Sequence, residues 1–211
     1  MTVRGDVFVA PRDGELPAAV EVVFDGDGRI GYADETPDDR TAAGLLIERW
    51  SGHRTGPVIW GDHHSPRQVH TMSEPMRCAG CGQAPDTDDR GILWVLNTRP
   101  DVLSAHQGEP IRTTVPPMCV TDAGRALSSC VPLRGAATVL RVREAPLVGV
   151  RGTLYSQSGR ILLDQHFALL RDPCVHQMVV QQLVRELVDY EIDTTTIPRA
   201  SPPAIVLPNS S

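Results

Sequence analysis

Residues 76–82 read Met-Arg-Cys-Ala-Gly-Cys-Gly, and this stretch has the form of a zinc knuckle. The two residues between Cys78 and Cys81 place both sulfurs toward one metal ion, and the glycines let backbone amides turn onto the thiolates. The stretch therefore predicts a zinc site around which the rest of the fold is arranged.

A second cysteine element follows in residues 116–127, where Pro-Pro-Met-Cys leads into Val-Thr-Asp-Ala-Gly-Arg-Ala-Leu. This sequence is typical of a strand end that runs into a short helix, with Cys119 at the start of the helix. A knuckle followed by a hairpin and then by ligands at a helix N-terminus resembles the treble-clef arrangement. We therefore expect Cys119 to share one metal ion with Cys78 and Cys81.

The fourth ligand is open between several side chains. A regular treble clef carries a cysteine three positions after the first one on the helix, but here that position holds Asp122. Cys130 would complete an all-thiolate site, whereas Asp122 would give three sulfurs and a carboxylate, which is less usual for a closed structural site. We favour Cys130, with Asp122 as the alternative and a nearby histidine as a third choice.

Two other interpretations of the cysteines are open. Free cysteine behaves as a small apolar side chain, and a plain buried role suits Cys174, which has no cysteine close to it in sequence. A redox pair is the second interpretation, but the glycine-rich knuckle lacks the strand-to-helix context that activates such a thiolate. The odd count of five cysteines fits a four-thiolate site with one to spare.

The composition limits the classes of function. All 20 basic residues are arginine, and the absence of lysine excludes a Schiff-base enzyme and a Walker-type phosphate loop. The formal net charge of −6 disfavours a protein that wraps nucleic acid through a broad basic surface. The first residues lack the apolar core of a signal peptide, and no stretch approaches the roughly 18 apolar residues of a membrane span. We therefore predict a cytoplasmic protein without a membrane partner, whose cysteines stay reduced.

Short strands are expected in the first two thirds of the chain. Residues 7–9 and 19–24 are rich in β-branched and aromatic side chains, and a turn of Asp-Gly-Asp-Gly leads to a hairpin return through residues 29–32. The apolar run at 91–96 has the length of a strand, with residues 111–115 as its expected partner.

Three helices are expected outside the cysteine region. Thr36 and Pro37 are typical of a helix start, and apolar residues then recur on one helical face as far as residue 50. A short helix is expected after Pro66. The strongest helical spacing runs from Pro173 to about residue 189, where apolar side chains recur every three or four positions.

The remaining sequence completes an α+β fold of mixed short strands and hairpins with a few helices around the treble-clef-like zinc module. Strands are expected at 136–150, broken at Pro146, and a hairpin pairs 153–155 with 160–163. We divide the chain into an N-terminal strand-hairpin-helix part at 1–60, a zinc-binding module at 61–135, C-terminal strands with an amphipathic helix at 136–193, and a disordered tail at 194–211.

Further motifs surround the cysteines in the central third of the chain. They are His-Ser-Pro-Arg-Gln at 64–68, Gly-Ile-Leu-Trp at 91–94 and Pro-Pro-Met-Cys at 116–119. Together with the knuckle they resemble a family of uncharacterised actinobacterial proteins, and the sequence Gln-Leu-Val-Arg-Glu-Leu at 182–187 is also similar to that family. The resemblance implies a degenerate treble-clef-like zinc module and brings no known activity.

The cysteine layout also resembles the zinc-binding frame of HNH-type nucleases. Those enzymes need a histidine pair or an Asp-His between the two cysteine elements to activate water and hold a catalytic metal. Between Cys81 and Cys119 the chain offers only His106, so the nuclease chemistry is missing.

One histidine cluster is a candidate catalytic or metal site. Asp62-His63-His64 lies close in sequence to His53 and His70. Adjacent side chains of a strand point to opposite faces, so His63 and His64 address one ion only from a loop, which the surrounding glycines and prolines permit. Solvated histidines that flank the zinc module are the simpler interpretation.

Two main hypotheses of function follow. The first is a zinc-stabilised intracellular adaptor without catalysis, which contacts a protein partner through exposed side chains. The second is a metal-dependent enzyme of a specialised bacterial pathway that uses His63, His64 and His70. A nucleic-acid-binding treble-clef protein is a further alternative. The side chains expected to contact the partner are Arg67, Arg77, Trp94 and Arg99.

Overall fold

A computed structural model describes residues 7–105, 108–133, 135–195 and 197. Within them the chain forms a mixed α+β fold in which antiparallel strands predominate. This confirms the predicted class of strands and hairpins with a few helices. The disordered tail predicted from residue 194 falls almost entirely outside the described residues, as does His106.

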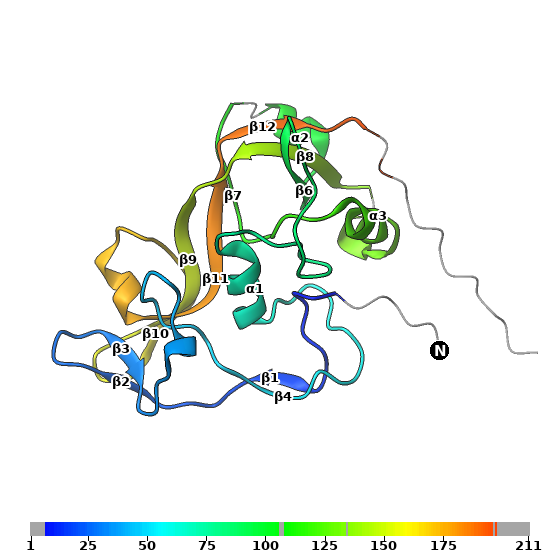
Figure 1. The fold of residues 1–211 in the computed structure, drawn as a ribbon. Helices are drawn as coiled ribbons and strands as arrows, with labels where there is room; N and C mark the ends of the chain where they lie inside the picture. The colour runs from blue at the N-terminus through cyan, green and yellow to red at the C-terminus, as the bar shows by residue number, and fades with distance from the viewer. Residues whose placement is uncertain (1–6, 106–107, 134, 196, 198–211) are drawn as a thin grey trace, which may run out of the picture.

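Two four-stranded antiparallel sheets form the body of the fold (Figure 1). The first sheet has the strand order β10-β9-β11-β7, and the second has the order β12-β8-β6-β5. The strands of the first sheet are β7 (Ile111–Thr113), β9 (Leu147–Tyr155), β10 (Ile161–Leu169) and β11 (Met178–Leu187). Those of the second are β5 (Thr87–Asp88), β6 (Gly91–Asn97), β8 (Ala137–Glu144) and β12 (Asp189–Ile192).

The two sheets are joined at two places, where a strand of one sheet continues directly into a strand of the other. β8 leads into β9 across Ala145 and Pro146, and β11 leads into β12 across Val188. The Val188 amide donates to the Glu144 carbonyl at 3.0 Å, and the Glu186 amide donates to the Pro146 carbonyl at 3.0 Å. Proline lacks the amide that a ladder needs, so the break predicted at Pro146 becomes the corner between the sheets.

Two small hairpin-like pairs complete the strands. β2 (Val22–Phe24) pairs with β3 (Ile30–Tyr32), which confirms the hairpin predicted across the Asp-Gly-Asp-Gly turn. β1 (Glu15–Pro17) pairs with β4 (Trp50–Gly52). The hairpin predicted after residue 153 is also confirmed, because β9 turns directly into β10.

Helix α1 (Ser65–Met72) packs on β11 and is the helix predicted after Pro66. Gln68 is fully buried, and its side-chain amide donates to the Thr114 and Leu183 carbonyls at 2.8 and 3.0 Å while its oxygen accepts from the Leu183 amide at 2.8 Å. Arg185 of β11 donates to the Met72 carbonyl at 2.9 Å, at the end of the helix where carbonyls lack partners. The buried polar groups are thus satisfied, and they fix the helix on the strand.

The main core joins residues 45–72 to residues 150–183. It lies between α1, the first sheet and the segment before β4, and a single set of contacts links residues far apart in the sequence. Its buried members are Leu45, Ile47, Val69, Met72, Val150, Ala168, Val175, Met178, Val180 and Leu183.

The helix predicted from Pro173 to residue 189 is wrong. Only the 3-10 turn η3 (Pro173–Gln177) precedes strand β11, which lies between β9 and β7 in the sheet. Register shifts between Val180 and Gln182 and between Val184 and Arg185 interrupt the two-residue alternation of the strand. Because this central strand is also buried on both faces, its apolar residues recur at a spacing that imitates a helix.

The helix predicted for residues 37–50 is wrong as well. The chain forms the 3-10 turn η1 (Pro37–Asp39), then a tight loop in which Gly44 has a φ of 78°. The Thr41 amide donates to the Leu45 carbonyl at 2.9 Å, so the loop folds back. Ile47 then bridges β11, and the apolar residues reach the core from extended backbone.

The predicted pairing of residues 91–96 with residues 111–115 is wrong, although both segments contain strands. β6 is flanked by β8 and β5, and β7 pairs with β11 in the other sheet. The chain bonds to the backbone of β6 at Met118, whose amide donates to the Leu93 carbonyl at 2.9 Å.

The remaining helices are short. They are α2 (Pro100–Ala105), α3 (Val120–Ser129) and the 3-10 turn η2 (Val131–Leu133). In the described part of the chain, no helix has the length and apolar character needed to cross a membrane.

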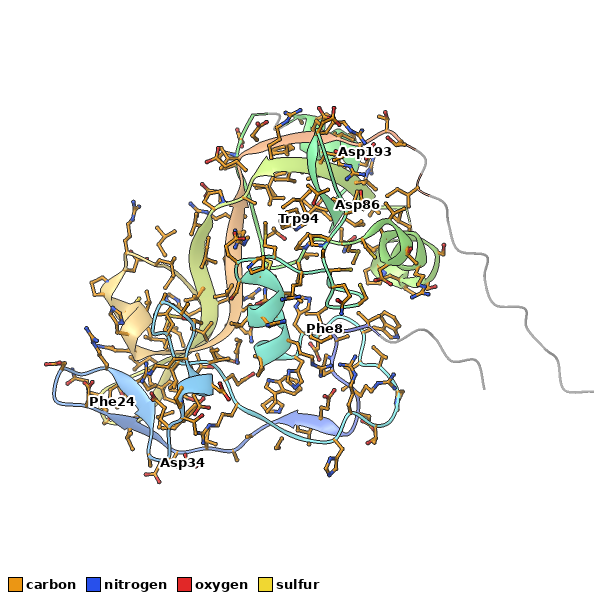
Figure 2. The ribbon with its side chains drawn as sticks, viewed as in Figure 1. Phe8, Phe24, Asp34, Asp86, Trp94 and Asp193 are labelled. Carbon is orange, nitrogen blue, oxygen red and sulfur yellow. The ribbon has the colours of Figure 1, made fainter. Side chains whose placement is uncertain are left out.

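A buried ion-pair cluster closes the second sheet where β12 ends (Figure 2). The carboxylate of Asp193 accepts from Arg141 at 3.0 Å and from Arg90 at 3.1 Å, and its side chain is 1% exposed. Burial alone would raise the pKa of Asp193, but hydrogen bonds from Thr195 and from the two arginines hold it well below its usual value. A folded-state pKa below the unfolded one stabilises the fold above about pH 4, and this stabilisation is lost as the pH falls.

We expect Asp193→Asn to lower the free energy of unfolding at pH 7 by about 2 kcal/mol, because the buried Arg141 guanidinium loses a charged hydrogen-bond partner while it keeps Asp86. The difference from the wild type should shrink at pH 3. Chemical denaturation at pH 7 and at pH 3 measures this difference in the free energy of unfolding. Asp189→Asn is the control, because Asp189 is 53% exposed and pairs with Arg143; an equal loss in both variants would contradict the buried role.

Candidate metal centre

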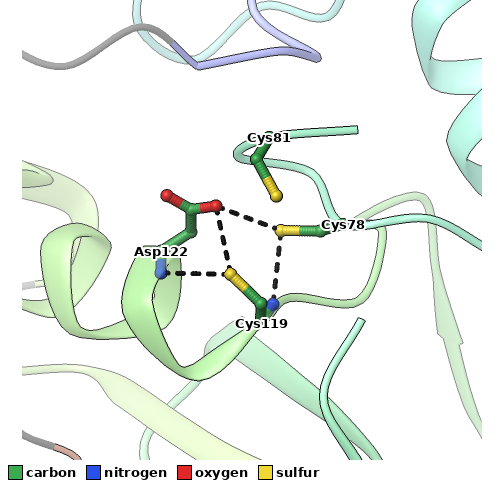
Figure 3. A group of neighbouring side chains, drawn as sticks. All are labelled: Cys78, Cys81, Cys119 and Asp122. Carbon is green, nitrogen blue, oxygen red and sulfur yellow. Dashed lines mark hydrogen bonds between the residues drawn. The ribbon is translucent and has the colours of Figure 1, made fainter. Parts of the chain in front are cut away.

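Four side chains converge between the knuckle and α3 (Figure 3). The sulfurs of Cys78, Cys81 and Cys119 and one carboxylate oxygen of Asp122 all lie within 4.8 Å of one another. A tetrahedral ion with metal–sulfur bonds of about 2.3 Å needs ligand atoms about 3.8 Å apart. Small side-chain rotations would therefore close this group on an ion, and the cluster could hold a metal.

Backbone amides already point at the sulfurs. The Gly80 and Cys119 amides donate to the Cys78 sulfur at 3.3 and 3.2 Å, and the Asp122 amide donates to the Cys119 sulfur at 3.5 Å. Cys119 is the N-cap of α3, where the helix dipole and unpaired amides favour negative charge. The site is thus built to stabilise thiolates.

Backbone hydrogen bonds hold the knuckle from both sides. The Cys78 amide donates to the Gln83 carbonyl at 2.7 Å, which closes the turn, and the Ala79 amide donates to the Pro117 carbonyl at 2.8 Å. On the other side the Phe8 amide donates to the Gly80 carbonyl at 2.7 Å. The strand predicted at residues 7–9 is wrong, because this segment bonds to the knuckle without forming a strand.

Two glycines of the knuckle are required by close contacts. A Cβ atom on Gly80 would lie 2.4 Å from the Asp122 carboxyl carbon, so only glycine lets the aspartate approach. Gly82 has a φ of 71°, and a Cβ atom there would meet the Phe8 ring at 3.0 Å. The glycine-rich sequence therefore serves both the turn and the approach of Asp122.

The protonation of the cluster follows from burial and hydrogen bonds. Burial raises the pKa of the Cys78 and Cys119 thiols. Burial would raise the pKa of Asp122 too, but hydrogen bonds from Cys119, Cys81 and Cys78 lower it. The Asp122 carboxylate accepts from the Cys119 and Cys78 thiols at 3.2 and 3.4 Å. A metal ion would replace these thiol protons, so its binding releases protons.

Asp122, and not Cys130, completes the cluster. Cys130 is the C-cap of α3, whereas Cys119 is its N-cap, and a helix of 10 residues separates its two ends by about 15 Å. The favoured fourth ligand is therefore too far away, and the aspartate at the cysteine position of a regular treble clef takes its place. Cys174 lies in η3 and packs against the main core, which fits the plain buried role.

Among the described residues, the four candidate histidines do not form a group of metal ligands. The Nδ1 atom of His63 lies 2.7 Å from the Gln182 amide, and the His64 ring stacks on Trp50 with centroids 4.4 Å apart. His70 is exposed on α1, and His53 is exposed after β4. Within the described residues, no histidine belongs to a group of three or more potential metal ligands.

The side chains expected to contact a partner are mostly not exposed. Trp94 is fully buried, and its indole donates to the Val115 carbonyl at 2.7 Å. Arg67 is 12% exposed and pairs with Glu15 at 2.6 Å. Arg99 is the exposed member of the set, and Arg77 is half-buried. The aromatic residue in this set is a core residue, because β6 is the inner strand that faces both α3 and the second core cluster.

Comparison with protein-family models, with curated proteins and with solved structures gave no match to this chain.

Sequence reasoning missed the residues around the cluster. The contact of Phe8 with Gly82 joins the N-terminal segment to the knuckle, and Arg125 donates to Asp122 at 3.2 Å from one turn further along α3. The three-residue spacing of Asp122 and Arg125 is the one feature of the sequence that could have predicted their contact on a helix.

We expect Cys130→Ser to leave metal binding unchanged, because this sulfur lies at the far end of α3. Asp122→Ala should weaken the affinity for Zn²⁺ by about tenfold or more, because it removes one of four ligands. Competition with a chromophoric chelator measures both affinities. Loss of binding in the Cys130 variant, with binding intact in the Asp122 variant, would contradict the ligand set that the cluster indicates.

Proposed function

We propose that this chain is a zinc-stabilised intracellular interaction protein without catalysis of its own. The observation that carries the proposal is the cluster of three cysteines and Asp122, which gathers its ligands from two segments far apart in the sequence and is tied by backbone to a third. Thiolates select zinc over magnesium or calcium, and a site with four protein ligands has no open position for substrate. The free state of all five cysteines suits a reducing compartment.

The order of elements supports a treble-clef-like module. The knuckle is followed by the β5–β6 hairpin, and α3 then supplies Cys119 and Asp122 from its first turn. In this chain a long excursion through α2 and β7 separates the hairpin from the helix. The ion would act as a cross-link between the knuckle and α3, which is the usual role of structural zinc in small modules.

An exposed apolar edge supports the interaction role. β10 is the outer strand of the first sheet, and Ile161, Leu162 and Leu163 are 61%, 56% and 49% exposed. Apolar side chains on an open sheet edge are typical of a strand that pairs with another chain. β10 belongs to the first sheet, whereas α3 of the cysteine cluster packs on β6 of the second sheet.

The charges of Asp164 in β10 and of Arg160, which directly precedes the strand, favour a second copy of this chain as the occupant. If two β10 strands pair antiparallel about Leu162, Arg160 of each copy stands opposite Asp164 of the other. Opposite charges across a strand pair are favourable, and such a self-complementary arrangement is what a two-fold interface needs. We propose that the chain associates through this edge.

The metal content tests the function. We expect one zinc per chain in protein purified without added metal, lost in Cys78→Ser and retained in a His63→Ala, His64→Ala double variant, as measured by elemental analysis. The structural site depends on the thiolates, and the histidines lie apart from it. A second ion that disappears with the histidines would instead favour the metal-dependent enzyme.

The pairing at β10 has its own test. Sedimentation equilibrium of the metal-loaded protein should show reversible formation of a dimer, and Leu162→Glu should shift the chain to a monomer by placing two carboxylates face to face. Val131→Glu is the control, because Val131 is 65% exposed on η2. A monomer at every concentration of the wild type would contradict the pairing.

A further inference from the structure

An open hollow of about 440 Å³ lies beside the metal centre. It reaches the cluster directly, because two of the four potential ligands form part of its wall, and Cys81 is exposed. Its volume suits a small organic molecule. The hollow is lined by Phe8, Arg54, Gly80, Cys81, Asp122 and Arg125.

The two oxygens of Asp122 have different partners. Oδ2 faces the sulfurs of Cys119 and Cys78 at 3.2 and 3.4 Å, whereas Oδ1 accepts from the Arg125 guanidinium at 3.2 Å. Arg125 is 58% exposed, so its guanidinium can follow the carboxylate toward the hollow. If the Asp122 carboxylate moved away from a bound ion, the Arg125 guanidinium would therefore be within reach to pair with it.

The ligand set makes Asp122 the exchangeable member. Three thiolates bind a zinc-type ion strongly, and a carboxylate is the harder and less preferred ligand beside them. Zinc sites that bind substrate keep three protein ligands and leave the fourth position to water or substrate. If Asp122 moves to Arg125, the three cysteines remain and the fourth position opens toward the hollow.

We infer that the hollow binds a small organic carboxylate, which takes the fourth metal position while Arg125 holds the displaced Asp122 carboxylate. One carboxylate replaces another, so the charge at the metal is unchanged. This inference rests on the proposed metal site and changes its character from closed to ligand-gated. It gives the interaction protein a way to respond to a small molecule.

The walls of the hollow match an organic anion. Arg54 donates to the Val7 carbonyl at 3.1 Å, and its guanidinium lies 5.9 Å from the centre of the Phe8 ring. A fixed cation above an aromatic face favours a ligand with both a negative group and an apolar body. An inorganic anion would use the arginines alone and gain no apolar contact with the hollow.

A simpler role for the arginines makes a different prediction. Three thiolates and a carboxylate leave a divalent centre with net negative charge, which neighbouring guanidinium groups offset. If that is their whole role, an added carboxylate does not change the coordination of the ion. The two roles therefore differ in a spectroscopic signal of the metal itself.

The test uses the full chain loaded with Co²⁺, whose visible absorption reports its ligands, and benzoate as the probe. At constant ionic strength we expect a saturable change in the absorption bands with a dissociation constant of about 1 mM. Arg125→Met should raise this dissociation constant about tenfold or more, because the displaced Asp122 carboxylate loses its charged hydrogen-bond partner.

Arg99→Met is the matched control, because Arg99 is 63% exposed and pairs with Asp101 much as Arg125 pairs with Asp122. It should leave the benzoate titration unchanged. A spectrum that does not respond to benzoate, in protein with one Co²⁺ per chain, would overturn the exchange and leave the structural metal site standing. Protein that binds no metal would overturn both.

Discussion

The closure of residues 78–82 onto the first turn of α3 is the contact on which the arrangement of the described chain depends. It brings three thiols and a carboxylate together where burial opposes thiolate charge, and backbone amides from both elements point at the sulfurs. These groups are joined by thiol-to-carboxylate hydrogen bonds. The same geometry could hold a metal ion with little movement, so the same few residues join the segments and form the candidate site.

The segment between β7 and α3 carries this constraint to both sheets. It has no regular structure of its own, yet most of its backbone groups are hydrogen-bonded to a different element, as buried polar groups must be. Through these bonds the knuckle, α1 and β6 are fixed relative to one another. The bonds run from Gln68 to the Thr114 carbonyl, from Trp94 to the Val115 carbonyl, from Ala79 to the Pro117 carbonyl and from Met118 to the Leu93 carbonyl.

The sequence predicted the elements that local chemistry determines. The knuckle glycines, the turn before β3, the corner at Pro146 and the helix after Cys119 all follow from backbone preferences of a few residues, and the structure contains them. The helix at 173–189 failed because β-bulges and burial on both faces of β11 are tertiary properties that imitate helical spacing. The prediction of the partner of β7 was wrong for a related reason, since the sequence of a three-residue strand does not specify which strand it pairs with.

The cluster was predictable in its three cysteines but not in the choice between Cys130 and Asp122. The preference for an all-thiolate site is chemical, whereas the answer depends on where α3 ends, which places Cys130 about 15 Å from the first turn. Gly80 also favours Asp122, because a side chain larger than hydrogen at residue 80 would collide with the aspartate. The similarity to the actinobacterial family stays a prediction.

X-ray absorption at the zinc edge of the purified full chain tests the central claim most directly. We expect three sulfur neighbours at about 2.3 Å and one oxygen at about 2.0 to 2.2 Å, the distances of thiolate and carboxylate ligands. A shell of four sulfurs would contradict the account, because it would require Cys130 to reach the knuckle from the far end of α3. A shell with nitrogen or oxygen in the majority would contradict it as well, because the ion would then lie outside the cysteine cluster.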